Sequence, residues 1–201
     1  MNTETTYQGP AIDDPDILEY VPPELRELLA ETNGFVRWSG GLHLRGACRK
    51  PQWHSLREAM FGPMALHALY PDVLDPTDVP FAQDCSGDQF VLRGGEVHQL
   101  AAEVGEIDPL GIDLRGFLGQ IEADPVEALC MHPLLRYLRD GGVLQPGRLL
   151  LAYPPFCTGQ SGAGASLRDV PALEVIRFHA DLARRINDLG GGEEFVFRAN
   201  E

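Results

Sequence analysis

Hydrophobic positions recur along the chain in two periods, which predicts a mixture of helices and strands. Spacings of three and four residues predict amphipathic helices over 23–32, 113–123 and 172–189. Alternation and short apolar runs predict strands over 79–83, 89–93, 96–100 and 148–153, with a hairpin over 35–46. Because strands and helices come in runs rather than in strict alternation, the pattern favours the α+β class with a mainly antiparallel sheet.

Turn and capping residues mark the ends of several elements. Gly94-Gly95 lies between two strand patterns and is the strongest hairpin signal in the chain. The segment 84–88 is predicted to be a turn, because Asp, Ser and Gly form side-chain-to-backbone bonds or adopt positive φ. Ser55, Asp113 and Asp124 have the sequence context of helix N-caps. Weaker signals predict short helices over 63–70 and 133–139, a strand through Val104 and Ile107, a loop over 154–166 and a last strand over 195–198.

The chain divides into a short polar beginning and one domain. Residues 1–17 are polar and acidic and include Pro10 and Pro15, so we expect a mobile acidic lead-in. Residues 18–201 have the length of one ordinary domain.

Thirty acidic residues against sixteen basic ones give a formal net charge of −14. This excludes general binding to nucleic acid or to anionic membranes, both of which require cationic side chains. The charge is uneven, since residues 63–131 hold thirteen acidic residues and only two arginines. A field of one sign over that segment would attract and orient a basic protein partner.

Neither export nor a metal site is expected. The first twenty residues contain no Lys, no Arg and no apolar run, so we expect no secretory signal. The four cysteines form no C-x-x-C pair, which favours reduced thiols in a cytoplasm. Cys130 and His132 are the one such pair within two residues, and no second pair has zinc-ligand spacing. We therefore expect no metal and no cofactor.

Three passages, taken together, resemble the SUKH superfamily of Smi/Knr-type proteins. They are the helix 23–29 with its Thr32-Asn33-Gly34 ending, the strand–turn–strand segment 79–92, and the segment 95–107 that leads to the helix around Phe117-Leu118. The resemblance covers about residues 20–130, with residues 131–201 as a C-terminal extension packed on that core. It implies a curved antiparallel sheet wrapped by helices. It also implies a non-enzymatic function, and it brings no catalytic residues.

The resemblance allows two kinds of binding function. Bacterial members are implied to be immunity proteins that bind and neutralise toxins, often nucleases, and fungal members to be regulatory scaffolds. We expect an immunity-type protein that covers a basic toxin domain with an acidic surface. The expected partner-binding residues are Asp84, Ser86, Asp88, Glu96, Glu103, Glu106 and Asp108. Trp38 and Trp53 are candidates either for aromatic contacts with the partner or for positions in the core.

A hydrolase using Ser161 or Cys157 with a histidine is the alternative from another class. The segment 159–163 approximates a nucleophile elbow, with Ala in place of the last Gly. An elbow follows its strand directly, whereas Pro154-Pro155 intervenes here, so a loop is the preferred interpretation. His179 lies on the apolar stripe of the last helix and is predicted to be a packed or half-exposed core histidine rather than a base.

Overall fold

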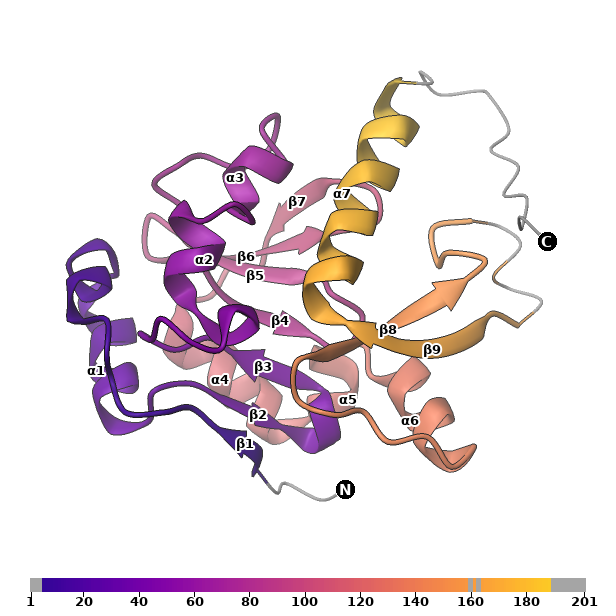
Figure 1. The fold of residues 1–201 in the computed structure, drawn as a ribbon, viewed down its shortest axis with the longest axis horizontal. Coiled ribbons are helices and arrows are strands. Elements are labelled where there is room, and N and C mark those ends of the chain that lie inside the picture. Colours follow the sequence, from indigo (N-terminus) through magenta and orange to yellow (C-terminus); the bar gives the residue numbers. More distant parts are fainter. Residues whose placement is uncertain (1–4, 159–160, 162–163, 189–201) are drawn as a thin grey trace.

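A seven-stranded antiparallel sheet lies at the centre of the computed structural model, which describes residues 5–158, 161 and 164–188 (Figure 1). The strands follow one another in chain order, so each is hydrogen-bonded to the next. They are β1 (Thr5–Gln8), β2 (Phe35–Arg37), β3 (Leu42–Leu44), β4 (Val79–Asp84), β5 (Gln89–Arg93), β6 (Glu96–Ala101) and β7 (Glu106–Pro109). A separate antiparallel pair consists of β8 (Arg148–Tyr153) and β9 (Ser166–Pro171).

Helices surround the sheet and complete a single α+β domain, as the sequence predicted. The α-helices are α1 (Pro23–Glu31), α2 (Leu56–Phe61), α3 (Leu66–Leu69), α4 (Leu114–Ala123), α5 (Pro125–Ala128), α6 (His132–Arg139) and α7 (Ala172–Asp188). Short 3₁₀ helices are η1 (Pro15–Tyr20), η2 (Trp38–Gly40) and η3 (Gln52–His54). In the view of Figure 1, α7 crosses in front of the sheet and α4 lies behind it.

The predicted turns and caps have the expected geometry. Gly94 and Gly95 have φ of 60° and 89° between β5 and β6, where Arg93 faces Glu96. This is the left-handed conformation that a two-residue hairpin turn requires. The Ser55 hydroxyl accepts the Glu58 N–H at 3.3 Å, so the predicted N-cap begins α2. Asp113 and Asp124 cap α4 and α5 in the same way.

The sheet is buried from two sides by different helices, and β5 shows this best. Phe90 faces one side, where its ring lies 4.6 Å from that of Phe117 on α4. Val91, the next residue, belongs to a second buried cluster with Leu100 and with Val175 of α7. Neighbouring residues of a strand point to opposite faces, so the apolar run in β5 reflects a strand covered on both faces. Helix α7 thus packs against the sheet over β5 and β6.

The N-terminal segment corrects one expectation. Residues 1–17 were predicted to be a mobile lead-in, yet β1 pairs with β2 and Ile17 is fully buried. The Asp14 side chain is completely buried, where it accepts a hydrogen bond from Arg57 Nη2 at 2.9 Å. A second arginine, Arg49, lies 3.5 Å from the same carboxylate. One acidic residue of this segment, Asp14, therefore holds it against α2. An acidic composition was not sufficient evidence that the segment is mobile.

The C-terminal part adds one strand that the sequence did not predict. Strand β9 occupies residues 166–171, between the predicted loop over 154–166 and helix α7. The Leu150 N–H donates to the Cys85 carbonyl at 2.8 Å, which joins β8 to the main sheet region. The predicted strand over 195–198 lies outside the described residues. Within the described part of the chain, no helix combines the length and apolar character needed to cross a membrane.

Candidate functional site

A pocket of about 480 Å³ lies where the turn after β4, the end of β6, the start of α6, the loop after β8 and helix α7 meet. We call it the acidic pocket. It is lined by Asp84, Ser86, Asp88, Ala101, Glu103, Val104, Cys130, His132, Pro133, Phe156, Cys157 and His179. Three of these side chains are carboxylates, and no Lys or Arg is among these described lining residues.

Asp84 is fixed by the turn that it begins. Its Oδ1 accepts the backbone N–H groups of Ser86 and Gly87 at 2.8 Å each and of Asp88 at 3.0 Å. Gly87 has a φ of +100°, which permits the tight turn that aims these N–H groups at one oxygen. The residue is 2% exposed, so the carboxylate is both buried and immobilised at the pocket.

Asp88, at the end of the same turn, and Glu103, which follows β6, supply two further carboxylates. Asp88 Oδ1 accepts the Ala102 N–H at 2.9 Å, and its Oδ2 lies 3.4 Å from Gln99 Nε2. Glu103 is 9% exposed and accepts the N–H groups of Phe156 at 3.2 Å and Cys157 at 2.7 Å. The backbone thus holds all three acids in place.

Burial makes this cluster electrostatically costly. Burial, and then the nearby Asp88 carboxylate, raises the pKa of Asp84 well above its usual range, although three backbone N–H groups oppose the shift. Burial also raises the pKa of Asp88, with a smaller contribution from Glu103. Charged forms of neighbouring buried acids repel each other, and a cation bound between them would relieve that repulsion.

His179 of α7 completes the pocket wall. It is 2% exposed, and neither ring nitrogen has a hydrogen-bond partner among the described residues. Its Nε2 lies 3.8 Å from Glu103 Oε1, beyond hydrogen-bond distance. Burial lowers the pKa of His179 to about 4, so the ring is neutral at pH 7 and does not offset the negative charge of the carboxylates.

The structure divides the predicted partner-binding residues into two groups. Asp84, Ser86, Asp88 and Glu103 line the acidic pocket. Glu96 lies at the start of β6, and Glu106 and Asp108 lie on the edge strand β7. The last three are not among the residues that line the pocket, and their contact with a partner stays a prediction.

The two tryptophans have structural surroundings. Trp38 is 5% exposed and belongs to the main hydrophobic core, which agrees with its interpretation as a core residue and leaves little of its ring for a partner to contact. Its φ of 53° lies in the left-handed region, at the start of η2 in the connection between β2 and β3. Trp53 is half-buried, with its ring 4.9 Å from that of Tyr7 and 5.0 Å from that of His43.

The side chains of the hydrolase alternative are not arranged as a nucleophile and base. The Ser161 hydroxyl donates to backbone carbonyls, with Thr158 O at 2.7 Å and Phe156 O at 3.0 Å. Burial, and then the Glu103 charge, raises the pKa of the Cys157 thiol to about 12, which disfavours a reactive thiolate. No hydrogen bond in the described part of the chain joins either residue to a histidine. A nucleophile needs such a base within reach.

The remaining chemistry of the pocket was not predicted as a group. Cys130 and His132 line it, but no set of three His, Cys, Asp or Glu side chains in the described residues is arranged to hold a metal ion. Sequence patterns gave no signal that Phe156 and His179 meet there, because they come from a loop and a helix far from β4 in the chain.

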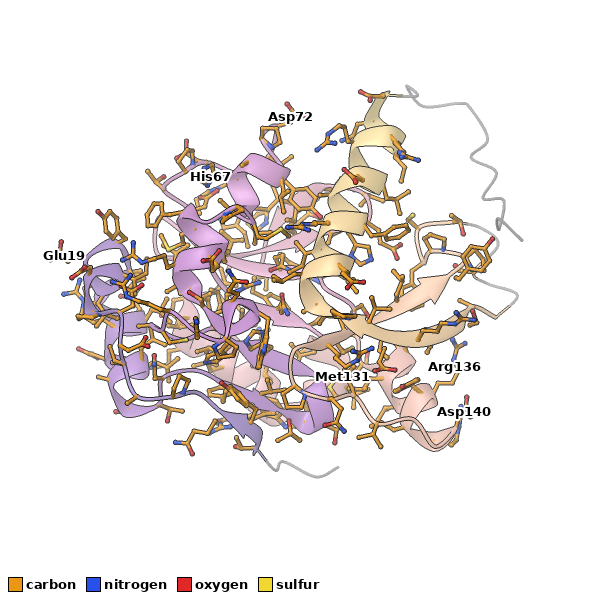
Figure 2. The ribbon with its side chains drawn as sticks, in the orientation of Figure 1. Glu19, His67, Asp72, Met131, Arg136 and Asp140 are labelled. Carbon is orange, nitrogen blue, oxygen red and sulfur yellow. The ribbon has the colours of Figure 1, made fainter. Side chains whose placement is uncertain are left out.

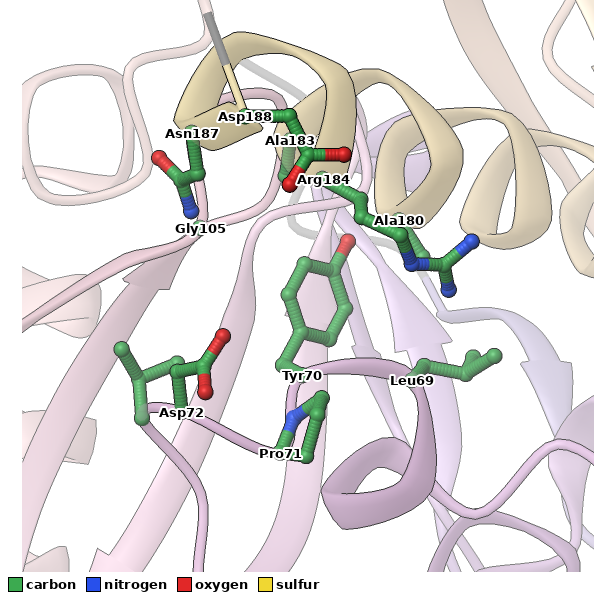
Figure 3. Close-up of a pocket in the computed structure, with 11 residues that line it drawn as sticks. Leu69, Tyr70, Pro71, Asp72, Gly105, Ala180, Ala183, Arg184, Asn187 and Asp188 are labelled. Carbon is green, nitrogen blue, oxygen red and sulfur yellow. The ribbon is translucent and has the colours of Figure 1, made fainter. Parts of the chain in front are cut away.

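A second pocket, of about 220 Å³, lies between the segment after α3 and the end of α7 (Figure 3). Tyr70 points toward α7 in this view, and its hydroxyl donates to the Ala102 carbonyl at 3.0 Å. The charged residues around it, Asp72, Arg184 and Asp188, are exposed and of both signs. Water competes for these groups, so the second pocket is the weaker candidate for a charged ligand.

Several other acidic residues are exposed at separate places on the surface. Glu19, Asp72 and Asp140 are all exposed, and Figure 2 shows them at three separate edges of the molecule. The acidic pocket therefore differs from the rest of the acidic surface by burial and fixed geometry rather than by charge alone.

The structure is that of an α+β domain with a buried acidic pocket. No family model and no curated protein matches the sequence. The fold is similar to that in the crystal structure of Atu4351 from Agrobacterium tumefaciens, with a TM-score of 0.53 and 15% sequence identity. The match covers 90% of this chain and 84% of that chain. At this identity the similarity concerns the fold alone.

Proposed function

We propose that the protein is a non-enzymatic binding protein of the immunity type, which neutralises a basic toxin domain such as a nuclease. The observation that carries this proposal is the acidic pocket, where Asp84, Asp88 and Glu103 converge without a neutralising Lys or Arg among the described lining residues. A solvated acidic surface only aids solubility, whereas buried and backbone-fixed carboxylates are suited to a specific cationic partner.

Charge and apolar contact would have different effects in this mechanism. The −11 segment over residues 63–131 would speed encounter with a basic domain, and this contribution should weaken as salt screens the field. Apolar pocket residues such as Val104, Pro133 and Phe156 would exclude water from the contact. Exclusion of water strengthens the polar contacts and slows dissociation.

Co-expression tests the proposal directly. The gene would be expressed in a bacterial host together with a toxin encoded beside it, and growth and complex formation would be measured. We expect wild-type protein to restore growth and to co-purify with the toxin. The Asp84→Asn/Asp88→Asn double variant should lose protection, whereas Glu106→Gln/Asp108→Asn, with the same change in charge on β7, should retain it. The absence of both rescue and a complex with wild-type protein would refute the immunity function.

A regulatory scaffold is the other binding function that the family resemblance implies. It predicts no toxin gene beside this one and a partner that is not toxic when expressed alone. The neighbouring open reading frames therefore distinguish the two functions before any protein is purified.

A further inference from the structure

One buried polar side chain in the acidic pocket has no partner. His179 is 2% exposed, lines the pocket, and uses neither ring nitrogen in a hydrogen bond with the described residues. Buried polar groups are nearly always paired, so an unpaired ring facing a pocket indicates a group that binds there. This observation is independent of the carboxylate cluster, because His179 comes from α7 and not from the sheet.

The acceptors around the pocket come from different elements of the fold. The hydrogen bonds of Asp84 in the described structure all use Oδ1, which leaves Oδ2 available. Glu103 Oε1 faces His179 Nε2 across 3.8 Å, a gap that no direct hydrogen bond closes. A neutral imidazole also offers one acceptor nitrogen. The site therefore presents several acceptors to a ligand that carries several donors.

We infer that the acidic pocket receives a guanidinium group, the side chain of an arginine on the partner protein. This inference rests on the proposed function, because it supplies the contact by which a basic partner would be held. A guanidinium carries five N–H donors in one plane and is less strongly hydrated than an ammonium, so it suits buried acceptors on separate walls. Ala101, Val104 and Phe156 would contact its methylene groups.

Other cations fit the site less well. A metal ion needs several ligands close together, and the described residues contain no set of three His, Cys, Asp or Glu side chains so arranged. A lysine ammonium is a compact, strongly hydrated charge, which would leave acceptors on one wall unpaired. The pocket volume of about 480 Å³ also exceeds what a bare ion would fill.

Three small compounds test the assignment without any toxin. They are N-acetyl-arginine N-methylamide, the corresponding lysine compound, and the citrulline compound, which has the shape of arginine without its charge. Binding to the full chain would be followed by NMR titration at low salt. We expect the arginine compound to bind and the citrulline compound to bind at least about tenfold more weakly, since charge-assisted hydrogen bonds are lost. Equal binding of the arginine and lysine compounds would overturn the guanidinium assignment.

Two variants examine the pocket by different routes. Asp84→Asn removes a charge but keeps an oxygen for the three backbone N–H groups, and His179→Leu removes the ring nitrogens without touching a carboxylate. Each variant should bind the arginine compound about tenfold more weakly than wild type does. Asp108→Asn on exposed β7 is the matched control and should bind as wild type does. Circular dichroism verifies folding, and a folded wild-type protein that binds no arginine compound would refute the inference.

The toxin experiment separates this inference from the proposed function. Rescue by wild-type protein that does not bind the arginine compound would leave the immunity function standing and refute the pocket assignment. Binding of the compound without rescue would refute the immunity function alone. Binding together with rescue that Asp84→Asn and His179→Leu do not diminish would show that the pocket takes a free guanidinium compound, which would overturn the assignment to a partner side chain.

Discussion

Substitution of His179 by leucine should separate stability from binding in one residue. The ring is 2% exposed and both nitrogens are unpaired among the described residues, so the folded protein loses their hydration without a compensating bond. An unsatisfied buried polar group costs about 1–3 kcal/mol. Leucine has a similar size and no polar atoms, so His179→Leu should leave the free energy of unfolding at pH 7 unchanged or raise it by up to about 2 kcal/mol.

The same substitution should reduce the sensitivity of the fold to acid. Burial lowers the pKa of His179 to about 4, whereas the unfolded residue keeps its ordinary value. The unfolded state therefore binds the proton more readily, and this contribution to stability is present above about pH 6.5 and falls as the pH approaches 4. Between pH 7 and pH 5 the loss amounts to about 2 kcal/mol.

Urea unfolding of wild type and His179→Leu at both pH values measures this quantity. Asp84 and Asp88 have raised pKa values, so they contribute in the opposite direction, with stability gained as the pH falls. Both acids are present in wild type and variant, so the difference between the two proteins isolates His179. The variant should gain about 2 kcal/mol on wild type at pH 5 relative to pH 7. If the free energies of unfolding of variant and wild type differ by the same amount at both pH values, His179 is not a buried neutral histidine. If the variant is clearly less stable at pH 7, the ring nitrogens of His179 are not unpaired.

Three further substitutions test the packing that supports the site. Asp14→Asn removes the charge that Arg57 pairs with and should lower the free energy of unfolding by about 2 kcal/mol in urea titrations at pH 7; a neutral effect would show that the Asp14 charge does not help to hold the N-terminal segment. Gly87→Ala should cost about 1–2 kcal/mol by thermal unfolding, because φ is +100° and a Cβ would lie 3.3 Å from His179 Nδ1. Gly94→Ala, with φ of +60° and no atom within 4 Å of a Cβ, is the control and should cost less. Arg45→Leu should cost at least about 3 kcal/mol in urea, since it removes the guanidinium that donates to four buried oxygens; a cost below 1 kcal/mol would show that these oxygens are satisfied by other donors.

Local signals predicted those parts of the fold that local chemistry determines. The hairpin at Gly94-Gly95 and the caps at Ser55 and Asp113 follow from backbone conformation and side-chain reach, so the sequence predicted them correctly. The sequences of strands β1 and β9 carry no regular apolar alternation, and all their residues are exposed or half-buried in the structure. They form because a neighbouring strand offers hydrogen bonds, and no local pattern records that.

Buried charge is a part of the fold that the sequence did not predict. Arg45 and Asp14 are 3% and 0% exposed, although charged residues are mostly found on the surface. The Arg45 guanidinium can be buried because it donates hydrogen bonds to four oxygens on β4 and β5, which belong to Pro80, Ala82, Gln83 and Gln89. A charge tolerates burial only when partners satisfy it, and those partners are distant in the chain. Composition therefore overestimated how much of the charge faces solvent.

The same reasoning explains why the sequence found only part of the acidic pocket. Asp84, Asp88 and Glu103 were candidates because they lie in an acidic, strand-rich segment, and the fold brings them to one cavity. His179 was predicted to be a core residue from its helical stripe, and its 2% exposure agrees with that prediction. What distinguishes it from the rest of the stripe is the carboxylate 3.8 Å away, which belongs to another element. Periodicity predicts which face of α7 is buried, but only tertiary packing determines whether a polar atom on that face finds a partner in the protein or is left for a ligand.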